Sequence, residues 1–170
     1  MNARIKGYSI VEFLIALFIL GALFSLAMLS LKNAGLRAEV RKTQQTLVAA
    51  INTAREASRR LSVNTEVKVA LQEQGYIILV KDETDQEINL KYSLPSSSII
   101  ERMTKSPTGE GLNWKPIADQ TTIAYYEPPF GETDASSTLI RVRHRKDPSI
   151  FACIRIIGVT GKVVASDACP

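Results

Sequence analysis

Histidine and cysteine, which serve as metal ligands and in nucleophilic catalysis, are scarce in this sequence. Its 170 residues include one histidine, His144, and two cysteines that do not form a Cys-x-x-Cys pair. A zinc site takes four ligands, mostly nitrogen and sulfur, so these residues are too few for one. His144 stands among arginines and a lysine, whose positive charge disfavours the protonated imidazole, and no nucleophile motif accompanies it. We therefore predict a protein that is not an enzyme and needs no cofactor.

Ionisable side chains are nearly absent from one long segment close to the N-terminus. Between Ile10 and Leu31 the only such side chain is that of Glu12, and no polar stripe interrupts the apolar residues. A helix of these 22 residues is about 33 Å long, enough to cross a hydrocarbon layer of about 30 Å. The segment therefore predicts a transmembrane helix.

The flanks of this segment bear on its orientation and on its fate. Arg4 and Lys6 precede it, and cations at a membrane end favour the cytoplasm, although further cations follow Leu31. An export signal that is removed has about 7 to 15 apolar residues and then a small-x-small cleavage site. This segment is longer, and only weak sites of that kind lie near its end. We therefore predict that it is retained, with the rest of the chain exported.

Glu12 is a charged residue within this otherwise apolar segment. An unpaired carboxylate in hydrocarbon costs several kcal/mol, so Glu12 is expected to have a partner. The alternative is that it lies at the depth of the interface and reaches water.

The residues around Glu12 resemble a known signal. The segment from Lys6 to Ala16, KGYSIVEFLIA, joins a short basic leader, a glycine, an aromatic residue, a glutamate and an apolar helix. In this it resembles the N-terminal signal of type IV prepilins and pseudopilins. The resemblance implies that prepilin peptidase cuts between Gly7 and Tyr8 and methylates the new amine of Tyr8. It also implies that Glu12 pairs with that amine on an adjacent subunit and sets the register of a filament.

The same resemblance implies the partners and the location of the chain. The partners are prepilin peptidase, other pilin or pseudopilin subunits and an assembly platform in the bacterial inner membrane. The chain crosses that membrane once, with its C-terminal domain outside the cytoplasm, before it enters the filament. Many pilins bend this helix at a proline, but no proline precedes Pro95 here. We expect less bending, with Gly21 and Gly35 as the weaker points.

After Leu31 the helical period continues and then gives way to strands. One face of the continuing helix is apolar, and it carries Leu36, Val40, Leu47, Ile51, Ala54 and Leu61. Alternating residues predict strands near 67–71, 76–80, 88–92, 121–126, 139–144, 150–157 and 163–165. Residues 99–120, interrupted by glycine and proline, are predicted to form a loop.

The predicted fold is therefore α+β, with one long helix against a small antiparallel sheet, as in the pilin fold. We divide the chain into a leader (1–7), a membrane and filament-core helix (8–31), an amphipathic helix (32–62) and a β-rich domain (63–170).

Two further stretches narrow the resemblance. The helix end from Thr46 to Arg60 and the segment Cys153-Ile154-Arg155-Ile156, followed by Gly161, are similar to GspH/FimT-like minor pilins and pseudopilins. Cys153 and Cys169 are an even pair in an exported domain, which predicts one disulfide that fixes the C-terminal tail. Free thiols are the alternative.

Charged clusters offer two binding hypotheses. Arg141, Arg143 and Arg145 share one face of a strand and would suit phosphates, with Lys162 nearby in a hairpin. The competing interpretation, which we favour, is a charged edge strand that blocks aggregation. Some relatives bind DNA through two arginines of a terminal hairpin, where this chain keeps only Lys162. The acidic residues from Asp82 to Glu87 are read as a solvated turn, because they lack the spacing of a calcium loop.

The sequence thus predicts a structural subunit, minor in abundance, of a type IV pilus. A minor pseudopilin of a type II secretion system and a DNA-binding minor pilin in DNA uptake are the alternatives. The formal net charge of +4 loses two positive charges with the leader, which adds little for nucleic acid.

Overall fold

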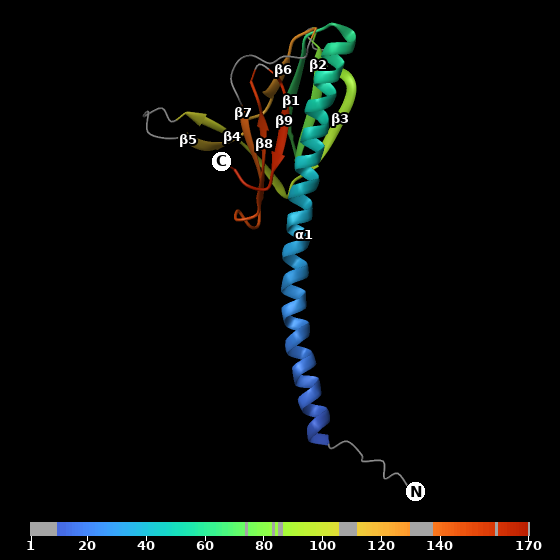
Figure 1. Ribbon diagram of the computed structural model, residues 1–170, viewed down its shortest axis with the longest axis vertical. Helices are drawn as coiled ribbons and strands as arrows, with labels where there is room; N and C mark the ends of the chain where they lie inside the picture. Colours follow the sequence, from blue (N-terminus) through green and yellow to red (C-terminus); the bar gives the residue numbers. More distant parts are fainter. Residues whose placement is uncertain are drawn as a thin grey trace. The chain divides into compact units, whose positions relative to one another are not determined.

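A computed structural model of the chain describes residues 10–73, 75–82, 84, 87–105, 112–129, 138–158 and 160–169. The chain divides into two units, Met1–Leu36 and Arg37–Pro170. The described residues form one helix, α1 (Ile10–Leu61), and two antiparallel sheets (Figure 1). The α+β class predicted from the sequence is confirmed, but the strands form two sheets where one was expected.

Helix α1 has different surfaces in the two units. Between Ile10 and Leu31, the large apolar side chains that the structure describes are exposed, and so is Glu12. From Val40 onward it carries a buried stripe at helical spacing, which includes Leu47, Ile51 and Ala54. Leu61, which was assigned to the same stripe, is instead 57% exposed. The helix ends there because Ser62 adopts a left-handed conformation with φ of 54°, a common way to terminate a helix.

The first sheet has four strands in the order β3-β2-β1-β6. The strands are β1 (Thr65–Gln72), β2 (Gly75–Asp82), β3 (Glu87–Pro95) and β6 (Thr121–Tyr126). The predicted β1–β2 hairpin is confirmed, and Gln72 pairs with Gly75 at its turn. Five consecutive residues of β2, from Tyr76 to Val80, are buried, so both faces of this strand are covered.

The second sheet has five strands in the order β5-β4-β7-β8-β9. The strands are β4 (Ser98–Lys105), β5 (Leu112–Pro116), β7 (Thr138–His144), β8 (Phe151–Ile156) and β9 (Val163–Ser166). The prediction of a loop over residues 99–120 is therefore wrong. Glycine and proline are concentrated at 107–111, between β4 and β5, while residues on either side pair with each other and with β7.

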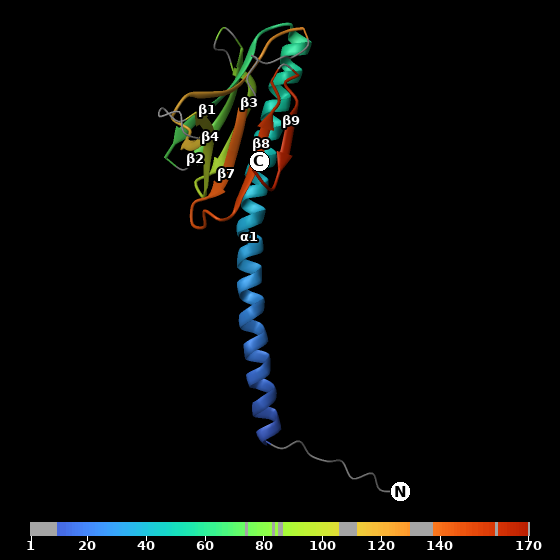
Figure 2. The same cartoon turned by 60° about the vertical axis from the view of Figure 1, so that its left-hand side comes forward.

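The core of the unit Arg37–Pro170 lies between the sheets and the second half of α1 (Figures 1 and 2). The stripe of α1 is buried together with alternating residues of β1, β7 and β8, such as Val67, Ile140 and Ile154, which are fully inaccessible. Every second residue of β7 is buried, as expected for a strand with one face on the core. The opposite face of β7 carries Arg141 and Arg143.

Candidate functional site

The most distinctive surface of the chain is the apolar segment of α1. Its described large apolar side chains are 49–80% exposed, and they include Phe13, Phe18, Leu23, Phe24 and Leu31. Among the described residues, α1 is the one helix long and apolar enough to cross a membrane, and none of that stretch is buried by the chain itself. A continuous apolar surface of this size is unfavourable in water and calls for lipid or for protein neighbours.

Glu12 lies in the first turn of α1 as described, on this apolar surface. It is exposed, and within the described residues it has no ion-pair partner. Gly7 and Tyr8, where cleavage and methylation are predicted, lie outside the described residues. The pairing of Glu12 with a terminal amine thus stays a prediction.

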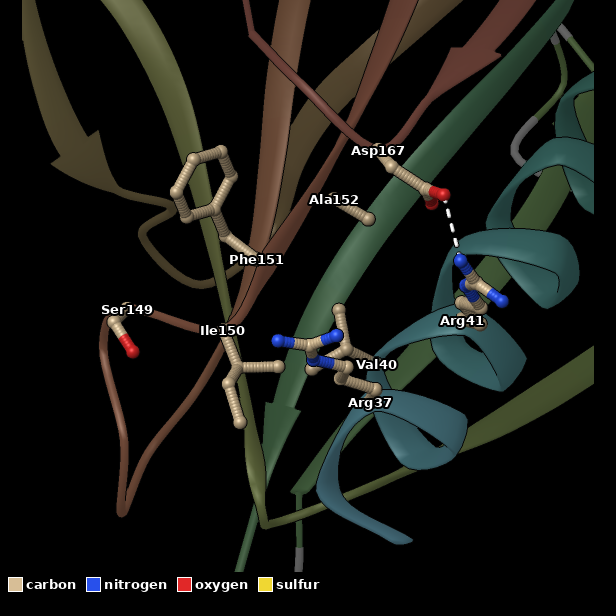
Figure 3. A pocket seen from close by; sticks show the side chains of 8 residues that line it. All are labelled: Arg37, Val40, Arg41, Ser149, Ile150, Phe151, Ala152 and Asp167. Carbon is tan, nitrogen blue, oxygen red and sulfur yellow. Dashed lines mark hydrogen bonds and ion pairs between the residues drawn. The ribbon is translucent and has the colours of Figure 1, made fainter. Parts of the chain in front are cut away.

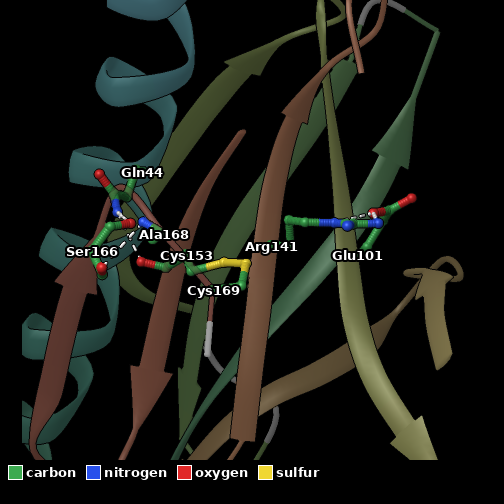
Figure 4. The surroundings of a disulfide bond; sticks show 7 residues. All are labelled: Gln44, Glu101, Arg141, Cys153, Ser166, Ala168 and Cys169. Atoms are coloured by element: carbon green, nitrogen blue, oxygen red, sulfur yellow. Dashed lines mark hydrogen bonds and ion pairs between the residues drawn. A yellow bond between two sulfur atoms is a disulfide. The ribbon is translucent and has the colours of Figure 1, made fainter. Parts of the chain in front are cut away.

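The predicted disulfide between Cys153 and Cys169 is confirmed (Figure 4). Their Cα atoms are 5.4 Å apart, within the usual range for a disulfide. Cys153 lies in β8 and is buried, whereas Cys169 follows β9 near the end of the chain. The disulfide therefore holds the C-terminal tail against the second sheet.

Helix α1 holds the same tail by polar contacts (Figure 4). The side-chain amide of Gln44 donates to the backbone carbonyls of Cys153 at 2.8 Å and Ser166 at 3.0 Å, so one buried side chain binds both β8 and β9. Arg41 donates to Asp167 at 2.7 Å beside it, although both of these side chains are largely exposed. Gln44 is therefore the main polar anchor, because a buried amide needs its partners more than an exposed pair does.

The two arginines of β7 form a cluster with a glutamate on the neighbouring strand. The carboxylate of Glu101 in β4 accepts from Nε of Arg141 at 2.8 Å and from Nε of Arg143 at 2.7 Å. Its side chain is only 5% exposed. The guanidinium of Arg141 also lies 4.5 Å from the ring centre of Trp114 and 5.9 Å from that of Phe151. These arginines are thus held within the protein by charge and by aromatic rings.

The four cations considered for nucleic acid are not gathered on one surface. Arg145 lies beyond the end of β7, next to the start of β8, while Lys162 lies in the turn after β8. The length of β8 separates the two. The prediction that the arginines mark an edge strand is wrong, because β7 lies between β4 and β8. Strand order depends on contacts that are remote in sequence, so the local pattern did not indicate it.

His144 is buried at the end of β7 on the core face. Its Nδ1 accepts the backbone N–H of Lys146 at 3.1 Å, so a neutral imidazole carries its proton on Nε2. Nε2 lies 3.4 Å from the carboxylate of Glu39 on α1. The histidine therefore joins the loop after β7 to the helix.

The described residues include no group of three histidine, cysteine, aspartate or glutamate side chains placed to hold a metal ion. In the acidic turn, Asp82 accepts from the backbone and the hydroxyl of Thr84, at 3.0 Å and 2.7 Å. Glu83 and Asp85 lie outside the described residues. The described part of the turn shows a local hydrogen-bonded bend.

Comparison of the chain with protein-family models, curated proteins and solved structures gave no match.

The structural roles of Glu101 and Gln44 were not predicted from the sequence. Gln44 had a detectable signal, since it is four residues after Val40 and three before Leu47, on the apolar face of the helix. A polar residue at a core position must find hydrogen-bond partners. Glu101 had no comparable signal, because its partners come from a strand 40 residues away.

Proposed function

We propose that the chain is a prepilin-type subunit of a type IV pilus or of a related pseudopilus, in the GspH/FimT-like branch. The observation that carries the proposal is the apolar surface of α1 from Ile10 to Leu31, which no described part of the chain covers and which holds a single carboxylate, Glu12. A membrane covers such a surface before assembly, and neighbouring subunits cover it in a filament. Apolar burial is maintained in both states.

Retention of the apolar segment is supported by the course of the helix. Residues 30–36, where a removable export signal would be cut, are helical in α1. They offer no turn or loop, the kind of exposed segment in which proteolytic cleavage concentrates. The second half of the same helix supplies Leu47 and Ile51 to the core of the folded unit. The second half of the helix is thus part of the core of the domain. A subunit that assembles through this helix needs such a connection.

The contacts of Arg141 and Arg143 also support a structural role for the chain. The carboxylate of Glu101 accepts hydrogen bonds from both Arg141 and Arg143, so these arginines are held within the protein. No observation favours the alternative of DNA uptake over a filament role. The geometry is common to pili and secretion pseudopili, so the proposal covers both.

The processing site gives the first test. N-terminal sequencing and mass spectrometry of the membrane-extracted chain should show a mature start at methylated Tyr8. Gly7→Val should leave the leader attached. An intact Met1 in cells that contain prepilin peptidase, or a new start after Leu31, would contradict the proposal.

Glu12 gives the second test. Glu12→Ala and Glu12→Gln should leave membrane insertion and cleavage intact but reduce incorporation into filaments, because the partner charge is then left unpaired in apolar surroundings. Glu56→Ala, which removes an exposed carboxylate from the second half of α1, is the matched control. Normal incorporation of both Glu12 variants would remove the register role of this residue.

A further inference from the structure

A cavity of about 280 Å³ opens beside the start of the folded unit (Figure 3). Its wall on α1 is formed by Arg37, Val40 and Arg41, and its opposite wall by residues 149–152 and Asp167. The side chains of Val40, Ile150 and Ala152 give it an apolar floor, while the guanidinium groups of Arg37 and Arg41 stand at its rim. A cavity of this composition suits an anionic group attached to a short aliphatic body.

Arg37 is the cation at this rim that is open to a ligand. It is exposed, and no ion pair or hydrogen bond joins it to another described residue. Arg41, in contrast, is already bound to Asp167 at 2.7 Å. On the opposite wall, the hydroxyl of Ser149 donates to Asp147 at 2.6 Å and keeps its lone pairs for a donor. The guanidinium of Arg37 has five N–H donors and prefers planar, two-point contacts with phosphate or carboxylate.

The loop that forms the opposite wall adds further positive charge. Arg145 and Lys146, in the same β7–β8 loop as Ser149, are both exposed. The contact of His144 with Glu39 places the start of this loop beside the helix near the cavity. Arg145, considered above for nucleic acid, therefore belongs to the same end of the folded unit as Arg37.

Few residues separate Arg37 from the apolar segment. Arg37 follows Leu31 by six residues, which span about 9 Å when helical and at most about 21 Å when extended. The headgroup layer on each side of a bilayer is about 5 to 8 Å thick. If the segment that ends at Leu31 crosses the bilayer, Arg37 is within reach of lipid phosphates.

We propose that this cavity binds the headgroup of an anionic phospholipid on the exported side of the membrane. Arg37 donates to the phosphate, the glycerol lies on the apolar floor, and Arg145 and Lys146 favour lipids with net negative charge. This inference rests on the proposed membrane location, but not on processing or on filament assembly. Its role is to hold the folded unit at the bilayer surface.

Native mass spectrometry of the full chain in detergent tests the proposal. The chain is mixed with phosphatidylglycerol or with phosphatidylcholine of the same acyl chains, and the retained lipid is counted. Wild type should retain phosphatidylglycerol in preference, and Arg37→Gln should lower that preference about fivefold, the value of one arginine near an anionic surface. Arg59→Gln, which removes an exposed cation from the far end of α1, is the matched control and should leave it unchanged.

Three results would overturn the proposal. They are equal retention of the two lipids by wild type, an unchanged preference in Arg37→Gln, and an equal loss in Arg59→Gln. A dimer that forms without lipid and is lost in Arg37→Gln would instead assign the cavity to a second copy of the chain. Carbonate extraction of cell membranes, which reports insertion separately, distinguishes these results from failure of the proposed membrane location.

Discussion

The cluster around Glu101 predicts that this one residue contributes strongly to the stability of the folded unit. In Glu101→Gln the side chain keeps its size but loses its charge, so Arg141 and Arg143 lose their common counter-ion. Removing one partner of a buried ion pair costs about 3–5 kcal/mol. The two guanidinium groups are 24% and 23% exposed and can turn toward water. We therefore expect a smaller loss, about 2–3 kcal/mol in the free energy of unfolding.

The loss is measurable with a reporter that the chain already contains. Trp114 is the only tryptophan, and its ring lies 4.5 Å from the guanidinium of Arg141, so its fluorescence reports on the cluster directly. For a domain of this size, 2–3 kcal/mol corresponds to a decrease of about 6–12 °C in the melting temperature. Circular dichroism of the full chain in detergent should show the same decrease, because the cluster joins β4 to β7.

The control is Glu66→Gln in the other sheet. Glu66 forms an ion pair with Lys68 two residues along β1 and is 21% exposed, so its loss should cost no more than about 1 kcal/mol. The double variant Glu101→Gln, Arg141→Gln should recover part of the lost stability, because it leaves one unpaired cation in place of two. A melting temperature of Glu101→Gln within two or so degrees of wild type, or an equal loss in Glu66→Gln, would refute this reasoning.

Three other predictions concern backbone space and protonation. Gly75→Ala should destabilise the chain by more than about 2 kcal/mol in chemical denaturation, because φ is 141° and a Cβ would lie 2.2 Å from a backbone carbonyl of β3; Gly35→Ala, in open space, should not destabilise it. Burial raises the pKa of the Tyr126 phenol. Its contribution to the free energy of unfolding is therefore complete below the unfolded pKa of about 10 and decreases as the pH rises above that value. Tyr126→Phe should lose less stability than wild type in denaturation at alkaline pH. Hydrogen bonds from Ser149 lower the pKa of Asp147, and NMR titration should find it closer to its ordinary value in Ser149→Ala.

The parts of the fold that the sequence predicts well are those with local patterns. The apolar segment, the helical stripe and the alternation of β1 and β7 are each readable within a dozen residues, and the structure has each of them. The tail disulfide was predictable because the chain has only two cysteines. In each case the physical preference depends on neighbours in sequence.

The parts that were not predicted depend on strand order. The loop predicted for residues 99–120 includes most of β4, although Ile100 is fully buried and pairs with Val142 of β7. That pairing brings Glu101 opposite Arg141 and converts two apparent binding residues into structural ones. A one-residue change of register would move Glu101 to the core face, so the cluster is a property of the pairing and not of either strand.

Gln44 holds the second half of α1 in one register against β8 and β9. If the helix were shifted by a single residue relative to the sheet, Gln44 would turn away from the carbonyls of Cys153 and Ser166. Two buried polar groups, the amide of Gln44 and the carbonyl of Cys153, would then lose this hydrogen bond, at about 1–3 kcal/mol each. Apolar contacts along Leu47 and Ile51 do not specify register so sharply, since a slip exchanges one apolar contact for another. The amide of Gln44 therefore fixes which residues of the second half of α1 face β8 and β9.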